Sequence, residues 1–147
     1  MNRLAVWAPL PELVELETEH GRQPMEREES GWWFGPAVPA GERYRFVVDG
    51  EPTPDPRSSR QPEGPFGWSE SVDHREFEWT DADWAGFPLA SAVIYELHVG
   101  TFSPEGTFAG VVDRLDHLAA LGITAIELMP VATFEGDRGW GYDGVNL

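Results

Sequence analysis

The apolar positions in the last third of the chain predict a strand, a helix and a second strand in succession. Residues 93–100 and 123–129 are apolar at both odd and even positions, which is typical of parallel strands that are covered on both faces. Between them, apolar residues recur at steps of three and four, and Gly122 follows where a helix C-cap is expected. The residues of this helical face are Phe108, Val111, Leu115, Leu118 and Leu121. A complete β/α barrel needs roughly 200 residues or more, so we expect this βαβ unit to be the front part of a larger fold.

The first half of the chain has a different pattern, with short segments of mostly alternating apolar positions. These segments lie at residues 4–7, 13–16, 32–34 and 44–48. Turn signals separate them, including Ser30-Gly31 and Asp49-Gly50. Strands at intervals of about ten residues are typical of a small antiparallel sandwich. We expect residues 72–79 to add one more strand to it.

Proline and glycine are concentrated in residues 51–70, where they exclude a helix or a central strand. Either a flexible linker or an ordered extended loop would fit. The donors and acceptors of Asp55, Arg57, Ser58 and Arg60 favour the ordered loop. The predicted domains are therefore residues 1–84, a β-sandwich that includes this loop, and residues 85–147, a βαβ portion.

Composition excludes several function classes. The formal net charge of −16 provides no basic surface for nucleic acid or for an anionic membrane. The absence of cysteine excludes disulfides and thiolate metal sites, the histidines lack metal-ligand spacing, and nothing indicates a cofactor. With neither a secretory leader nor an apolar run of about 18 residues, a cytoplasmic protein is the simplest expectation. The oligomeric state remains open.

Several motifs together resemble one enzyme family. They are Val6-Trp7-Ala8-Pro9, Gly31-Trp32-Trp33, Tyr44-Arg45-Phe46 with Val48-Asp49-Gly50, and the stretches from Pro54 to Gly64, from Tyr95 to Phe102, from Glu127 to Val131 and from Gly139 to Val145. With these motifs the chain resembles, over nearly its whole length, the N-terminal part of the malto-oligosyltrehalose trehalohydrolases of glycoside hydrolase family 13. The Tyr-Glu-Leu-His and Trp-Gly-Tyr-Asp motifs are shared with branching and debranching relatives, whereas Asp-Pro-Arg-Ser-x-Arg-Gln-Pro points to the trehalohydrolases.

The resemblance implies an immunoglobulin-like β-sandwich followed by the first βαβ portion of a (β/α)8 TIM barrel. It implies hydrolysis of the α-1,4 bond beside the terminal trehalose unit of maltooligosyl trehalose, a reaction of retaining glycosidases that releases trehalose. The family's nucleophile, acid/base and stabilising Asp would lie beyond Leu147, so we expect the 147-residue chain alone to be inactive. A branching or debranching α-glucan enzyme and a non-catalytic glucan-binding module are the alternatives.

The resemblance also implies sugar contacts in the loop after the second predicted barrel strand. Tyr142 would stack on a glucose ring, because an aromatic face suits the apolar face of a pyranose. Trp140 could offer a second aromatic surface and Asp143 could bind a hydroxyl, although the same residues would also suit a simple tight turn. His98 would reach the cleft floor or act as a core histidine.

Other notable residues receive structural interpretations. Glu96 and Glu127 lie within strands, so we expect them to form buried polar contacts inside the barrel wall and not to act in catalysis. Trp32 and Trp33 must point to opposite faces of a strand, so at most one belongs to the core. We expect Asp55, Arg57 and Arg60 to hold their loop against the barrel.

Overall fold

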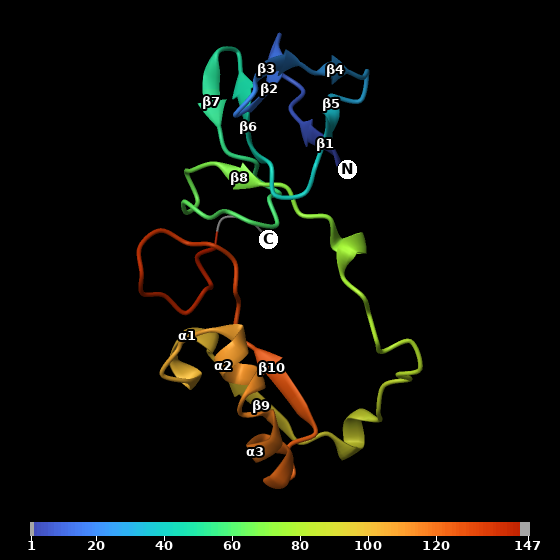
Figure 1. Cartoon of the computed structure of the whole chain (residues 1–147), viewed down its shortest axis with the longest axis vertical. Coiled ribbons are helices and arrows are strands. Elements are labelled where there is room, and N and C mark those ends of the chain that lie inside the picture. Colours follow the sequence, from blue (N-terminus) through green and yellow to red (C-terminus); the bar gives the residue numbers. More distant parts are fainter. Residues whose placement is uncertain (1, 145–147) are drawn as a thin grey trace. The chain divides into compact units, whose positions relative to one another are not determined.

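The computed structural model describes residues 2–144, which form two compact units. The first unit extends to Glu78, and the second comprises Trp79–Gly144. Figure 1 shows that the first unit is built of strands and that the second contains a strand pair with helices. The domain boundary predicted after residue 84 stays a prediction.

Two antiparallel sheets form the first unit. One has the order β1-β5-β4, with β1 (Asn2–Trp7), β5 (Trp32–Val38) and β4 (Glu26–Arg27). The other has the order β3-β2-β6-β7 with β8 also paired to β6, and comprises β3 (Gly21–Pro24), β2 (Val14–Thr18), β6 (Arg43–Val48), β7 (Glu51–Thr53) and β8 (Ser69–Glu70). The four strands predicted from apolar alternation are confirmed as parts of β1, β2, β5 and β6.

The two sheets share one apolar core, as expected for a sandwich. It contains Val6, Val14, Leu16, Met25, Trp33, Val38, Tyr44 and Phe46. These residues come from β1, β5, β2 and β6, that is, from both sheets, together with Met25 between β3 and β4. Trp33 is only 3% exposed, whereas Trp32 is partly exposed. The expectation that only one of the two tryptophans belongs to the core is therefore confirmed.

A two-residue turn joins β6 to β7, because Val48 pairs with Glu51. Asp49 and Gly50 both have positive φ angles, of 48° and 92°, as a type I′ hairpin turn requires. The carboxylate of Asp49 also accepts hydrogen bonds from the backbone of Glu12 and Leu13. The sequence signal Asp-Gly thus fixes this hairpin and ties it to the segment before β2.

The proline-rich loop is ordered, and a buried aspartate holds it against β6. The carboxylate of Asp55 accepts hydrogen bonds from the hydroxyl of Tyr44 at 2.7 Å and from the backbone N–H of Arg57 at 2.8 Å. The Arg57 guanidinium lies 5.6 Å from the centre of the Trp32 ring, and Arg60 forms an ion pair with Glu70. All of these contacts lie within the β unit, while the predicted contact of this loop with a barrel stays a prediction.

The predicted strand at residues 72–79 is wrong. A short 3-10 helix, η1 (His74–Glu76), occupies this stretch, and the last strand of the unit is β8. The carboxylate of Asp73 accepts a hydrogen bond from the backbone N–H of Arg75 and forms an ion pair with its guanidinium. Such a local side-chain bond competes with strand pairing, and apolar alternation could not reveal it.

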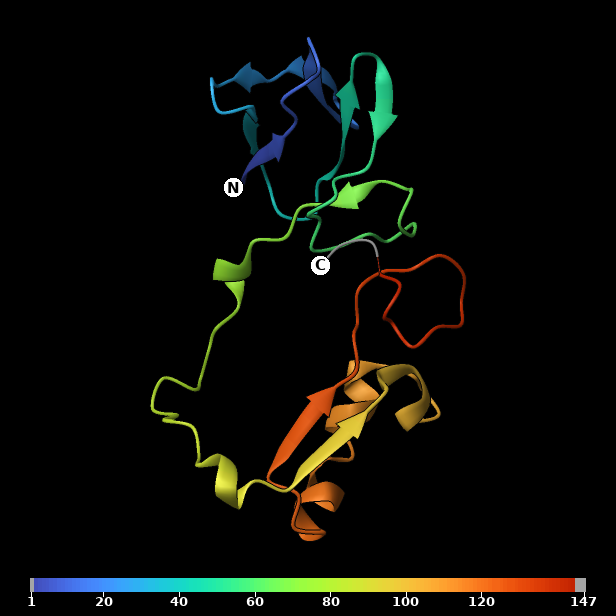
Figure 2. The same ribbon diagram turned by 180° about the vertical axis from the view of Figure 1, so that it is seen from behind.

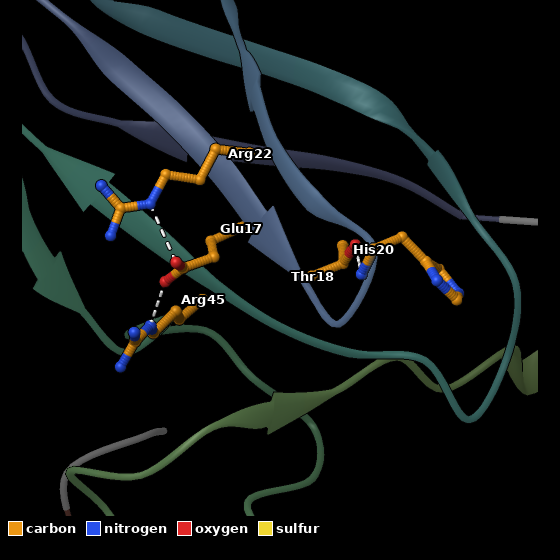
Figure 3. A network of polar contacts seen from close by, with 5 residues as sticks. All are labelled: Glu17, Thr18, His20, Arg22 and Arg45. Atoms are coloured by element: carbon orange, nitrogen blue, oxygen red, sulfur yellow. Dashed lines mark hydrogen bonds and ion pairs between the residues drawn. The ribbon is translucent and has the colours of Figure 1, made fainter.

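An outward-facing polar network links three strands of the larger sheet (Figure 3). Glu17 lies opposite both Arg22 and Arg45 in the strand register and accepts hydrogen bonds from both guanidinium groups. The Arg45 guanidinium also lies 4.5 Å from the centre of the Trp68 ring. The hydrogen bonds from Arg22 and Arg45 lower the pKa of Glu17. The stabilisation from this network is therefore present above the ordinary pKa of a glutamate and is lost as the pH falls.

The second unit contains two parallel strands and three short helices. They are β9 (Ile94–Leu97), α1 (Val99–Phe102), α2 (Phe108–Val112), α3 (Leu115–Ala120) and β10 (Ala125–Leu128), preceded by the 3-10 helix η2 (Leu89–Ser91). In Figure 2 the arrows of β9 and β10 point the same way. A small core forms where the helices meet the strands, with Leu97, Val111 and Leu118 buried. The predicted βαβ order is confirmed.

The predicted single helix of residues 108–121 is two helices, and the first strand is shorter than expected. A tightened turn separates α2 from α3, in which Arg114 N–H donates to the carbonyl of Val111. The strand β9 ends at Leu97, and α1 takes the residues from Val99 onward. Gly122 has a φ of 85° and follows Leu121, the C-cap residue of α3, so the helix ends where the glycine predicts it.

Replacement of Tyr44 by Phe should destabilise the β unit by about 1.5–3 kcal/mol, because it removes a hydrogen bond to a buried carboxylate. Burial, and then the charge of Asp55, raise the pKa of Tyr44. The folded protein thus keeps a proton that the unfolded chain releases above about pH 10, and wild-type stability falls as the pH rises through that range. Urea unfolding between pH 7 and pH 11 should show the gap between wild type and Tyr44→Phe narrowing above pH 10. Tyr95→Phe, in the other unit, is the control, and a gap that stays constant with pH would contradict the prediction.

Candidate functional site

The candidate site lies where β9 and β10 end. Leu97 pairs with Leu128, so the carboxyl ends of the two parallel strands lie at one edge. The chain continues from β9 into α1 and from β10 into the loop of residues 129–144. Figure 1 shows this loop closing back on itself. Sites of β/α proteins are built at this end of the strands.

A cleft of about 770 Å³ opens between these two segments. Its walls come from the turn after β9, which comprises residues 98–101, from the start of α2 and from the loop after β10. The lining residues are His98, Val99, Gly100, Thr101, Phe108, Pro130, Val131, Ala132, Phe134, Asp137, Arg138, Gly139 and Trp140. Most of them are apolar or aromatic, with a few charged or hydrogen-bonding groups, as in sites that bind small molecules.

His98 joins the two walls of the cleft. Its Nε2 lies 3.0 Å from the carbonyl oxygen of Gly139, and its Nδ1 lies 3.2 Å from Oγ1 of Thr101. The ring is also 6.4 Å from the ring of Trp140, between centres. His98 therefore lies in the wall of the cleft, and both of its nitrogens contact protein atoms.

Close backbone contacts shape the loop after β10, and they depend on two glycines. A side chain at Gly141, which has a φ of 87°, would place its Cβ 2.0 Å from the carbonyl oxygen of Pro130. A side chain at Gly139 would lie 2.9 Å from the ring of Phe134. The carbonyl oxygen of Pro130 therefore packs closely against Gly141 and closes the loop at its base. The ring of Phe134 packs against Gly139.

The aromatic residues between and after these glycines point to solvent. Trp140 is 70% exposed and lines the cleft. Tyr142 is 71% exposed, and Asp143 is also exposed, but neither is among the residues that line the cleft. The structure thus brings His98 close to Trp140, and Tyr142 and Asp143 follow Trp140 on the loop after β10.

Four charged or aromatic residues that line the cleft are not among the site residues predicted from the sequence. Phe134, Asp137 and Arg138 belong to the loop after β10, and Phe108 begins α2. For the three loop residues, the sequence signal is their position in a long segment after a strand, between Met129 and the Trp-Gly-Tyr-Asp motif. Phe108 was assigned to the buried helical face, yet more than half of its surface is exposed.

Glu96 and Glu127 are not among the residues that line the cleft, and the buried polar contacts expected for them inside a barrel wall stay a prediction. They pair in register, so they lie side by side on one face of the strand pair. Both are exposed, because Leu97, on the opposite face, packs in the core with Val111 and Leu118 of the helices. Within the part of the chain that the structure describes, no other element covers the face with the two glutamates.

Neither a metal cluster nor a membrane span is found in the described residues. Between residues 2 and 144, no group of three or more His, Asp and Glu side chains could hold a metal ion. In the same residues, no helix has the length and apolar character needed to cross a bilayer.

Comparison with known proteins relates the chain to enzymes that act on α-glucans. It is 56% identical over 107 residues to the malto-oligosyltrehalose trehalohydrolase of Deinococcus radiodurans, which covers 73% of this chain and 18% of the relative. It is 46% identical to the enzyme of the same name from Mycobacterium tuberculosis, covering 99% of this chain and 26% of the relative. A 1,4-alpha-glucan branching enzyme of Nitrosomonas eutropha is 31% identical over 96% of this chain and 23% of its own length. No family model matches the chain.

Solved structures support the same relationship. A Salmonella typhimurium protein assigned to the alpha amylases matches with a TM-score of 0.90 and 43% identity, over 97% of this chain and 25% of that one. A pullulanase of Paenibacillus barengoltzii, solved in complex with maltotetraose, matches with a TM-score of 0.73 and 28% identity, over 98% of this chain and 29% of that one. The chain thus spans about a quarter of the length of its relatives.

Replacement of Gly141 by Ala should destabilise the loop more than the same change at Gly136. Both glycines have φ angles near 90°, so each substitution costs about 1–2 kcal/mol of backbone strain. Only at Gly141 does the new Cβ meet a backbone oxygen, whereas nothing lies within 4 Å at Gly136. This overlap should cost about 1–3 kcal/mol more. Thermal unfolding of the two variants measures the difference, and equal stabilities would contradict the packing described for Pro130.

Proposed function

Since this chain belongs to the malto-oligosyltrehalose trehalohydrolase family over the stretch that it matches, we propose that it forms part of an enzyme that releases trehalose. The reaction is hydrolysis of the α-1,4-glucosidic bond next to the terminal trehalose unit of maltooligosyl trehalose, by a retaining glycosidase. In this proposal, residues 1–84 are an immunoglobulin-like β-sandwich and residues 85–147 are the first βαβ portion of a (β/α)8 barrel.

The observation that carries the proposal is the exposed indole of Trp140 in the cleft at the carboxyl ends of β9 and β10. An aromatic ring with one free face binds the apolar C–H face of a glucose unit, and neighbouring polar groups bind its hydroxyls. Tyr142 supplies a second exposed ring two residues further along the loop. Asp143 is exposed beside it and is proposed to accept a hydrogen bond from a sugar hydroxyl.

The cleft by itself lacks the groups that break the glycosidic bond. Retaining hydrolysis needs two carboxyl groups about 5 Å apart, one as nucleophile and one as acid and base. Among the described residues that line the cleft, Asp137 carries the single carboxylate. We therefore assign this chain a substrate-binding role, and place the nucleophile, the acid/base and the stabilising Asp outside residues 1–147.

The partner implied by this function is a maltooligosyl trehalose or maltodextrin chain, which is uncharged. The net charge of −16 is compatible with such a substrate and unfavourable for nucleic acid or an anionic membrane. No step of the proposed reaction calls for a metal or a cofactor. A cytoplasmic location belongs to the same proposal.

A branching or debranching enzyme is the nearest alternative, because the branching enzyme of Nitrosomonas eutropha matches nearly the whole chain. Its identity of 31% is lower than the 46% of the trehalohydrolase of Mycobacterium tuberculosis over a similar stretch. The products separate the two. A trehalohydrolase releases free trehalose, whereas a branching enzyme re-links glucan and a debranching enzyme releases linear glucan.

The complete natural gene product should release trehalose from maltooligosyl trehalose, and the 147-residue polypeptide alone should release none. In the complete product, Trp140→Ala should raise KM by up to about tenfold with a smaller change in kcat, because an aromatic contact contributes about 0.5–1.5 kcal/mol. Trp84→Ala is the matched control, since Trp84 is equally exposed, at 70%, and lies outside the cleft. Branched or linear glucan without trehalose among the products would overturn the assignment, and equal KM values for both variants would remove Trp140 from the site.

A further inference from the structure

Both ring nitrogens of His98 contact protein atoms, unlike those of a side chain whose polar atoms are available to a ligand. The carbonyl of Gly139 can only accept a hydrogen bond, so Nε2 of His98 carries the hydrogen that it donates across 3.0 Å. The other nitrogen, Nδ1, contacts the hydroxyl of Thr101. Both polar atoms of the ring are therefore engaged by the protein, and neither is left over for a sugar hydroxyl.

The bond to Gly139 spans 41 residues of sequence and joins the turn after β9 to the loop after β10. The loop has its own closure at the base, where Gly141 meets Pro130. Two residues before Gly141, Gly139 packs against the ring of Phe134, and its carbonyl oxygen accepts the hydrogen bond from His98. The imidazole of His98 thus links the turn after β9 to the loop after β10 through a hydrogen bond.

The position of this hydrogen bond matters because Trp140 follows Gly139 directly. The carbonyl that His98 binds belongs to the peptide group that links Gly139 to Trp140. Since a peptide group is planar, holding its oxygen fixes the direction in which the chain enters Trp140. The ring of His98 also lies 6.4 Å from the Trp140 ring, between centres.

We propose that His98 is a positioning residue, which holds the Gly139–Trp140 peptide group against the turn after β9 and so fixes Trp140 at the edge of the cleft. This inference rests on the proposed function for its consequence, namely binding of a glucose unit by Trp140. The placement of the loop itself can be measured without any substrate. His98 acts on the sugar only through Trp140.

The chain offers a direct probe of this loop. Trypsin cleaves after arginine and lysine, and the chain contains no lysine. Arg138 is exposed and directly precedes Gly139, so cleavage between them requires local unfolding of the loop. Arg114, exposed between α2 and α3 in the same unit, is an internal reference site.

In the complete gene product, His98→Leu should speed cleavage after Arg138 about fivefold relative to cleavage after Arg114. This ratio corresponds to the loss of one hydrogen bond of ordinary net strength. His98→Gln keeps an N–H that can reach the Gly139 carbonyl, and its ratio should stay near that of wild type. His117→Leu, which removes an exposed histidine of α3, is the matched control and should leave the ratio unchanged. The fragments are quantified by mass spectrometry.

An unchanged ratio of Arg138 to Arg114 cleavage in His98→Leu would overturn the proposal, and so would an increase in His98→Gln as large as in His98→Leu. Equally faster cleavage after both arginines would also overturn it, because His98 would then support the whole unit. Steady-state kinetics then test the consequence. His98→Leu should raise KM for maltooligosyl trehalose more than it lowers kcat, and His98→Gln should restore it. If the product shows no trehalohydrolase activity at all, the proposed function fails, while the cleavage ratios still decide whether His98 holds the loop.

Discussion

Parallel pairing of β9 with β10 is the constraint on which the candidate site depends. Parallel strands cannot be joined by a tight turn, so the segment with α1, α2 and α3 forms the crossover between them. The pairing of Leu97 with Leu128 then brings both strand ends to one edge. The segments that follow lie close enough for His98 to reach Gly139, and the cleft forms between them. The register of β9 and β10 is therefore what brings Trp140 and His98 close to each other.

A second constraint, a buried carboxylate, organises the β unit. Asp55 lies in a proline-rich loop that has little regular structure, yet its carboxylate accepts hydrogen bonds from Tyr44 on β6 and from the backbone of Arg57. A buried charge is tolerated only when it is hydrogen-bonded in this way. The loop is therefore ordered by polar contacts within the unit, in the same way that His98 ties the loop after β10.

The sequence predicted the elements that depend on apolar periodicity or on turn chemistry, such as the two parallel strands, the hairpin at Asp49-Gly50 and the helix end at Gly122. It did not predict the break between α2 and α3, because neither glycine nor proline marks that break. It also did not predict η1, because this helix depends on the side chain of Asp73. For the site, the motif predicted Trp140, which lines the cleft, and Tyr142, which is not among the lining residues. The hydrogen bond from His98 to Gly139 depends on tertiary distance, which spacing along the chain does not reveal.

The most direct test of the central claim is a crystal structure of the complete gene product with a maltooligosaccharide bound. We expect a glucose ring stacked on the side chain of Trp140 or Tyr142, at the carboxyl ends of β9 and β10, with His98 still hydrogen-bonded to Gly139. A sugar chain bound in the active site without any contact to residues 129–144 would contradict the claim.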